Sequence, residues 1–187
     1  WFIESCKKIS YLFPRAHAVA YVMMAFRIAW FKVYHPLAFY AAYFSIRAKA
    51  FDLRIMTGDL NTQLKEFNRI KALDRGASPK EKDLMSALEV SMEMYQRGYR
   101  FINVDIQHSG ARRFSIKDGA LLPPFLAIDS LGETVADAIV EEREAKPFTS
   151  LKDLQRRCKV SATIIETMKE LKCCGDLPED EQMSLFG

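Results

Sequence analysis

The chain has 187 residues, of which 49% are hydrophobic and 27% charged, and its net charge at pH 7 is +3. This is ordinary for a soluble globular protein and predicts one or two compact units with their own cores. The four cysteines show neither metal-ligand spacing nor a disulfide-rich pattern, which excludes a disulfide scaffold and predicts a reducing cytoplasm. The adjacent Cys173 and Cys174 are interpreted as two small buried residues.

The longest apolar run, Ala18 to Phe31, is interrupted by Arg27, and we expect it to be too short to span a bilayer. No signal peptide is visible, so no membrane partner is expected. The chain begins at Trp1 inside a predicted helix, which indicates a segment of a larger protein.

Charge is distributed unevenly along the chain. Residues 1–58 hold eight basic and two acidic side chains, a net charge of +6, whereas residues 176–187 hold four acids and no base. A basic front and an acidic tail indicate an anionic ligand at one end and a different kind of partner at the other.

The first half of the chain has helical patterns. Pro14 suits the first position of a helix over residues 16–33, and Pro36 opens a second helix that reaches about Ala50. The aromatic-rich stretch from Trp30 to Phe44 is interpreted mostly as core rather than as a binding platform.

Two further helices follow before residue 98. Apolar residues recur at helical spacing from Leu60 to Ile70 and again from Leu84 to Tyr95. Residues 75–79 form a linker whose end begins the second of these helices, with Ser78 as N-cap, Pro79 at the first position and Glu81 completing a capping box. Gly98 is predicted to end it.

The hydrophobic period then changes to two. Residues 102–107 alternate between apolar and polar side chains, which predicts a half-buried strand. Residues 113–117 alternate again, and Asp118-Gly119 is a strong hairpin turn. Pro123-Pro124 ends this small β connector, to which we assign residues 99–123.

Short helical patterns fill residues 124–175. Ser150 with Asp153 makes a looser capping box, and Ser161 caps the last helix, with Val160 and Ile165 placed as a hydrophobic staple. Four short helices in pairs predict a tandem helix-hairpin-helix unit. The predicted fold is therefore mainly α with a small β-hairpin connector: a helical unit (1–98), the connector, the tandem unit and a flexible tail (176–187).

A helix-hairpin-helix unit binds DNA through backbone groups. The Ser130-Leu131-Gly132 turn leaves N–H groups at the start of the next helix for a phosphate, and the contact reads no sequence. Proteins with this motif usually have glycine where Ser130 stands. The predicted DNA-binding residues are Ser130, Leu131, Gly132, Glu133, Lys152, Arg156 and Arg157. Because residues 124–175 carry a net charge of −1, any contact is local, and a packing module without DNA contact is the alternative.

The helix that follows Pro14 is the second candidate site. Helix starts favour acids, yet this one has Arg15 and His17 in its first turn. This suits a polyanion, and Tyr21 lies on the same helical face as His17, where it can stack on a base. Arg15, His17 and Tyr21 are the candidate nucleotide-binding residues, with a solvated basic helix as the alternative.

Catalytic machinery is missing from the sequence. No pair of carboxylates lies on adjacent apolar strands, as two-metal phosphoryl transfer requires. Asp105 is interpreted as a solvated strand residue and His35 as a structural residue at a helix start. The chain alone is therefore expected to be inactive and to hold no metal or cofactor.

Apolar side chains stand on the acidic tail, which cannot bury them by itself. Their Gln-x-x-Leu-Phe spacing resembles the peptide by which bacterial replication proteins hold the sliding clamp. The candidate clamp-binding residues are Gln182, Met183, Ser184, Leu185 and Phe186. The alternative is a tail that folds back on its own domain.

Two segments carry a more specific resemblance. Phe13-Pro-Arg-Ala-His-Ala-Val-Ala-Tyr21 and the run from Trp30 to Asp52, with Phe-Ser-Ile-Arg-Ala-Lys-Ala-Phe-Asp at its end, closely resemble the fingers of the PolC-type DNA polymerase III alpha subunit of low-GC Gram-positive bacteria. With the tail, the resemblance extends over the whole chain. Met183 departs from the usual Leu of the clamp peptide, but Met fills such a pocket flexibly.

The resemblance implies the C-terminal part of a much longer polymerase, whose metal-binding aspartates and Mg²⁺ lie upstream in the palm. It places Arg15, His17 and Tyr21 on a fingers helix that faces the incoming deoxynucleoside triphosphate. It implies duplex primer–template DNA, the sliding clamp and the rest of the polymerase chain as partners, in a cytoplasmic, nucleoid-associated replisome. The alternatives are a DnaE-type polymerase, a repair protein with a helix-hairpin-helix module, and a helical scaffold.

Overall fold

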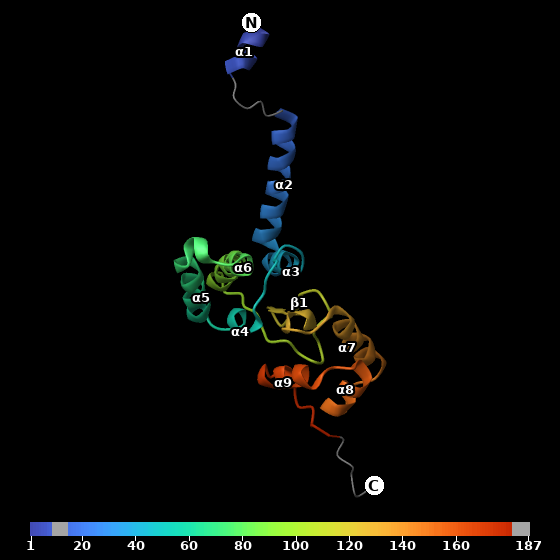
Figure 1. The fold of residues 1–187 in the computed structure, drawn as a ribbon. Coiled ribbons are helices and arrows are strands. Elements are labelled where there is room, and N and C mark those ends of the chain that lie inside the picture. Colours follow the sequence, from blue (N-terminus) through green and yellow to red (C-terminus); the bar gives the residue numbers. More distant parts are fainter. Residues whose placement is uncertain (9–14, 181–187) are drawn as a thin grey trace, which may run out of the picture.

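A computed structural model describes residues 1–8 and 15–180. Figure 1 shows one long helix, α2 (Arg15–Tyr34), projecting from a body that contains the later helices and a short hairpin, with α1 (Phe2–Lys8) nearer the N-terminus. The predicted class, mainly helical with a small β-hairpin, is confirmed. Pro14 and the candidate clamp residues Gln182–Phe186 lie outside the described residues.

The base of α2 is anchored to the body. Lys32 pairs with Glu93 at 2.9 Å, and Arg97 donates to the Lys32 carbonyl at 3.0 Å. After a break at His35, α3 (Pro36–Ile46) places Tyr40 and Phe44 in the core.

The predicted extension of the second helix to Ala50 is wrong. At the end of α3, the Ala48 N–H donates a hydrogen bond to the Tyr43 carbonyl at 3.0 Å, and the chain then bends. Asp52 caps a new short helix, α4 (Leu53–Met56), by accepting from the Ile55 N–H at 3.0 Å. A four-residue helix offers too little periodicity for a sequence pattern to reveal it.

The next pair of helices follows the prediction. Asp59 caps α5 (Leu60–Ala72), and a one-turn 3₁₀ helix, η1 (Asp74–Gly76), leads to α6 (Pro79–Gln96). The capping box between Ser78 and Glu81 is complete, and Gly98 follows the helix end with φ +85°. Together α3 to α6 enclose a first core, whose fully buried members include Tyr40, Met56, Ile70, Leu88 and Met94.

The predicted strand at residues 102–107 is wrong, although its alternation correctly marks which side chains are buried. Val104 and Ile106 are buried and Gln107 is exposed. In place of the regular hydrogen bonds of a strand, the segment makes isolated ones. The Ile102 N–H donates to the Leu121 carbonyl at 2.9 Å, and the Ile106 N–H donates to the Cys173 carbonyl at 3.0 Å. Alternation reports burial, whereas a strand also needs a continuous partner.

The hairpin prediction is confirmed. Strands β1 (Ser115–Lys117) and β2 (Ala120–Leu122) pair antiparallel, and Asp118 and Gly119 both take positive φ between them. Positive φ at both turn residues matches the twist of an antiparallel pair.

The last part of the chain forms a second core. A single 3₁₀ turn, η2 (Phe125–Ala127), is followed by α7 (Glu133–Ala145), α8 (Leu151–Cys158) and α9 (Ala162–Glu170). The first of the four predicted helices is therefore only a 3₁₀ turn. Cys173 and Cys174 are buried in this core, as predicted, and burial raises the pKa of Cys173 to about 12.

The second core is not confined to residues 124–175. Leu53, Val104 and Ile106 from earlier segments are part of it. Arg54 on α4 pairs with Glu170 on α9 at 2.6 Å. The predicted boundary at residue 124 stays a prediction, but the buried surface shows that α7 to α9 depend on residues before it.

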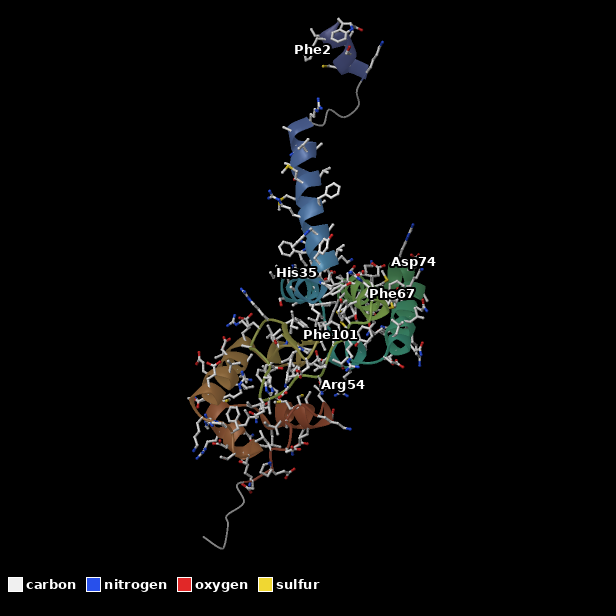
Figure 2. All side chains as sticks on the ribbon, turned by 180° about the vertical axis from the view of Figure 1, so that it is seen from behind. Phe2, His35, Arg54, Phe67, Asp74 and Phe101 are labelled. Carbon is white, nitrogen blue, oxygen red and sulfur yellow. The ribbon has the colours of Figure 1, made fainter. Side chains whose placement is uncertain are left out.

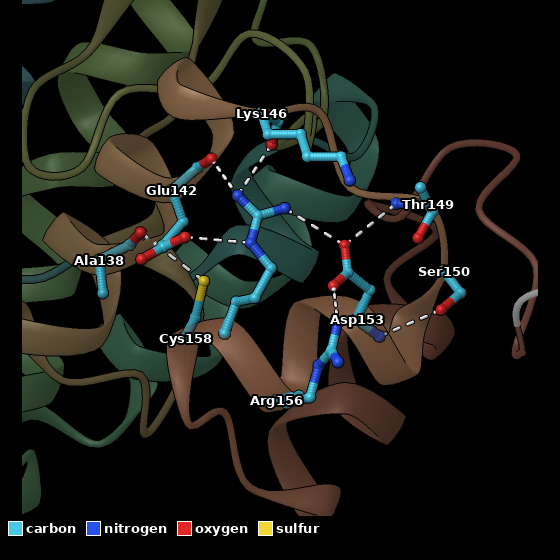
Figure 3. A network of polar contacts seen from close by, with 9 residues as sticks. Ala138, Glu142, Lys146, Thr149, Ser150, Asp153, Arg156 and Cys158 are labelled. Carbon is cyan, nitrogen blue, oxygen red and sulfur yellow. Dashed lines mark hydrogen bonds and ion pairs between the residues drawn. The ribbon is translucent and has the colours of Figure 1, made fainter.

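A polar network holds α8 against the end of α7 (Figure 3). Arg157 donates to the Glu142 carboxylate at 3.0 Å, the Asp153 carboxylate at 3.2 Å and the Lys146 carbonyl at 2.9 Å. Its guanidinium also lies 4.7 Å from the centre of the Phe148 ring. Burial raises the pKa of Asp153, but hydrogen bonds from Arg156, the Thr149 N–H and Arg157 outweigh this and lower it to about 2.

The Asp153 network should make stability sensitive to acid. A carboxyl group whose pKa is lower in the folded chain stabilises the fold above its unfolded pKa, near 3.9, and loses that contribution as the pH falls towards about 2. We expect the thermal unfolding midpoint to fall between about pH 4 and pH 2. Asp153→Asn should be less stable at pH 7 and show a smaller fall, measured by circular dichroism.

Glu89→Gln, which changes an exposed acid on α6, provides the control and should keep the parent's response to pH. An Asp153→Asn variant with the same acid response as the parent would show that Asp153 does not carry this effect.

Candidate nucleic-acid interface

The first hairpin joins η2 to α7 through Ser130, Leu131 and Gly132. Ser130 takes φ +65°, the left-handed conformation that glycine adopts more readily. Leu131 is buried in the second core, and Gly132 is the N-cap of α7 in extended conformation. The serine thus takes up the backbone conformation expected of the glycine that usually stands there.

The second hairpin repeats this backbone path between α8 and α9. Lys159 takes φ +53°, Val160 is buried, and Ser161 is the extended N-cap of α9. Two hairpins with the same order of left-handed residue, buried apolar residue and N-cap are what a tandem unit requires. The sequence names Lys159 among the basic residues that can contact DNA and Ser161 as a cap, but it does not reveal that they form a second hairpin equivalent to the first. The likeness of Ser-Leu-Gly to Lys-Val-Ser is too weak for that.

The start of α7 is open. The first N–H bonded within the helix is that of Ala136, which donates to the Gly132 carbonyl at 3.0 Å. Among the described residues, no side chain caps the start of α7. The N–H groups of Glu133 and Thr134, which are exposed residues, therefore have no partner within the helix. In α9, by contrast, the Ser161 hydroxyl accepts from the Ile164 N–H at 3.3 Å.

The three predicted basic contacts differ in their surroundings. The Arg156 side chain is 75% exposed and pairs with Asp153 at 2.8 Å. The Arg157 side chain is 15% exposed and donates to Glu142 and Lys146 at the end of α7 and to Asp153 on its own helix. The surroundings of Arg157 favour a structural role over the predicted DNA contact. Lys152 is exposed but pairs with Asp180.

A further arginine, which the sequence analysis did not select, lies beside the first hairpin. Arg112 pairs with both Glu133 and Asp137 on α7. The two acids are one helical turn apart on the same face. No short-range pattern links Arg112 to residues more than 20 positions later, so only the fold reveals this contact.

On α2, the three candidate nucleotide-binding residues lie in the first two turns and are exposed. The His17 and Tyr21 rings meet edge to face, with centroids 4.3 Å apart. Lys32 shares their helical face, but 15 residues at about 1.5 Å each place it roughly 22 Å from His17. It is tied to Glu93, so it anchors the helix and is not part of the same anion site.

No residue of α2 is buried within the described chain, and Figure 2 shows its side chains standing clear of the body. Trp30, Phe31 and Tyr34 are exposed, so the interpretation of this stretch as core holds only from α3 onwards. The expectation that the run is too short for a bilayer is also wrong on length: α2 has 20 residues and is apolar enough to cross a membrane by length and composition. Helices that are buried against other parts of a protein have the same length and composition.

Asp105 is not the solvated strand residue that was predicted. Its carboxylate lies 3.0 Å from Lys117 and 2.8 Å from His108, in an irregular segment that is half-buried. Within residues 1–8 and 15–180, no group of three or more His, Cys, Asp or Glu side chains could hold a metal ion.

Comparisons with known proteins identify the family. Residues 98–183 match the helix-hairpin-helix motif family. The DNA polymerase III PolC-type of Caldanaerobacter subterraneus subsp. tengcongensis is 50% identical over 186 residues, covering 100% of this chain and 13% of that protein. The DNA polymerase III PolC-type of Streptococcus pyogenes serotype M12 (strain MGAS2096) is 47% identical over 188 residues, with the same coverage. The chain thus spans 13% of the length of these relatives. It belongs to the PolC-type DNA polymerase III family and corresponds to its C-terminal region.

Proposed function

We propose that this chain is the part of a DNA-directed DNA polymerase that holds duplex DNA through two helix-hairpin-helix turns. The observation that carries the proposal is the repeated backbone path at the two hairpins, with the open N-terminus of α7 behind the first. A phosphate can accept from N–H groups at such a helix start without reading a base.

The charges of the unit support a local contact. The first hairpin offers backbone N–H groups, whereas the second adds Lys159 at its left-handed position. Arg156 and Lys152 lie exposed on the neighbouring helix α8. Because residues 124–175 have a net charge of −1, affinity should come from these few contacts and decline as salt rises.

We propose that the start of α2 faces the incoming nucleotide. Arg15 stands where the helix dipole already favours an anion, and the His17–Tyr21 pair lies next to it. The apolar side chains exposed around α2 support burial of this helix against the rest of a polymerase chain. Metal-dependent catalysis would then belong to residues outside this chain, which alone would be inactive.

We also propose that Gln182 to Phe186 bind the sliding clamp, as their resemblance to clamp peptides implies. The residues shortly before them are held on α8. The carbonyls of Pro178 and Glu179 accept from the Leu151 and Lys152 N–H groups, at 2.9 and 3.2 Å. Residues 178 and 179 are thus hydrogen-bonded to α8, while the side chains of Asp176, Glu179 and Asp180 stay exposed. Such a polymerase would work in the cytoplasm, at the nucleoid.

The first hairpin can be tested without disturbing the fold. Gly132 has a negative φ, and a Cβ there would meet nothing within 4 Å. Gly132→Val should therefore cause no clash at its Cβ and should stay folded, with a stability loss of about 1 kcal/mol because valine is a poorer N-cap than glycine, but it should obstruct an approaching phosphate. We expect duplex affinity at low salt, measured by fluorescence anisotropy, to fall about tenfold, and further than in Lys152→Ala.

Gly76→Val is the matched control, because a Cβ at Gly76 also meets nothing within 4 Å and the residue lies on η1 in the other unit. If Gly132→Val binds duplex DNA as well as Gly76→Val does, the phosphate contact is not at the first hairpin.

Arg15→Ala should impair nucleotide use in the whole polymerase. Loss of a cation at the triphosphate should raise the KM for nucleotides or lower kcat about tenfold or more, while duplex affinity changes little. Arg27→Ala changes an exposed arginine on the same helix, about 18 Å along its axis, and should have the smaller effect. Steady-state primer extension measures both, and unchanged constants in Arg15→Ala would make Arg15 a solvated helix residue.

A fluorescent peptide of residues 176–187 should bind the sliding clamp of the same organism with modest affinity, because a short peptide loses conformational entropy on docking. Phe186→Ala should remove most of that binding by taking away the largest apolar anchor. Ser184→Ala is the matched control and should bind nearly as well as the parent. Equal binding by the parent and Phe186→Ala, or binding by neither, would exclude the tail as a clamp motif.

A further inference from the structure

The first hairpin carries a charge that works against its proposed use. Glu133 is the first residue of α7, at the helix start where a phosphate would bind, and Asp137 lies one turn further on. Asp129 adds a third exposed acid just before the turn. A carboxylate beside the open N–H groups repels a phosphate and competes for the same positive end of the helix.

The loop that carries Arg112 is fixed against this hairpin. The Phe125 and Leu126 N–H groups donate to the carbonyls of Gly110 and Ala111 at 2.9 and 3.0 Å, which joins the loop to η2. From α7, Arg143 donates to the carbonyls of Ile106 and Ser109 at 3.0 and 2.8 Å. The backbone that leads into Arg112 is thus bound to the two elements that form the hairpin.

All three guanidinium nitrogens of Arg112 donate hydrogen bonds to the two acids of α7. Its Nε lies 3.0 Å from Asp137 Oδ1, one terminal nitrogen reaches the other Asp137 oxygen, and the second reaches Glu133 Oε2. The hydrogen bond from Arg112 also lowers the pKa of Asp137. The Glu133 carboxylate is therefore held towards Asp137, along the side of α7, with a cation between the two acids.

We propose that Arg112 is a positioning residue for DNA, which holds the Glu133 carboxylate aside and cancels its charge so that a phosphate can bind the N–H groups at the start of α7. This rests on the proposed duplex contact at the first hairpin. Arg112 acts through Glu133, not through a phosphate of its own, because its donors already face the two carboxylates.

A double-mutant cycle separates this role from a simple loss of positive charge. In the 187-residue chain, Arg112→Gln releases Glu133 and Asp137 and should weaken duplex binding at low salt about three- to tenfold, mainly because Glu133, the nearer acid, is then unpaired beside the phosphate. Glu133→Gln should bind at least as well as the parent. In the Glu133→Gln background, Arg112→Gln should have little further effect, because there is no carboxylate left at that position to release.

Arg113→Gln is the matched control, since it removes the same charge from the adjacent exposed position. It should weaken binding less than Arg112→Gln does. Thermal unfolding of each variant checks that its folded fraction at the binding temperature equals that of the parent.

Three outcomes would overturn the inference: no weakening in Arg112→Gln, equal weakening in Arg113→Gln, or the same loss with and without Glu133. The last would mean that Arg112 contacts DNA directly. Failure of the proposed function is distinguishable, because Gly132→Val would then bind duplex DNA like the parent. If Gly132→Val weakens binding and Arg112→Gln does not, only the role of Arg112 is excluded.

Discussion

Burial of one apolar side chain in each hairpin determines the shape of the helix-hairpin-helix unit. Leu131 and Val160 enter the second core from the middle of their turns. The preceding residues, Ser130 and Lys159, must then take the left-handed conformation, which costs roughly 1–2 kcal/mol for a residue with a side chain. Burying a Leu or Val side chain contributes about 1.5–3 kcal/mol, enough to hold each turn. The starts of α7 and α9 consequently follow turns of the same backbone shape, although only α9 has a side-chain cap.

With this arrangement, the proposed DNA contact does not depend on a net positive charge of the unit. The positive groups offered to a phosphate are backbone amides, whose number and direction depend on helix geometry and not on composition. The surrounding side chains can then be largely acidic, provided that the acids near the contact are paired. Arg112, on the connector loop, pairs with acids near the exposed start of α7. Arg157, on α8, pairs with Glu142 near the other end of α7, in the packed interior.

The features that sequence reasoning predicted correctly are encoded over short distances. The capping box of Ser78 and Glu81, the Asp118-Gly119 turn and the cap at Ser161 each depend on residues within a few positions. Predictions failed where distant partners decide. Residues 102–107 lack a continuous strand partner, and Arg157 is occupied by acceptors 11 to 15 positions earlier. The position of the first hairpin turn is predictable from the sequence, but which of the nearby arginines is free of protein acceptors depends on tertiary packing.

The docking of Pro178 and Glu179 on α8 limits how far the clamp motif can reach. A polypeptide extends at most about 3.6 Å per residue, so Phe186, six positions beyond Asp180, stays within roughly 22 Å of it. If residues 182–186 bind the sliding clamp as proposed, the clamp would be held within this distance of the unit that carries the two hairpins. The clamp and the duplex would then meet at a high effective concentration even when the peptide contact alone is weak.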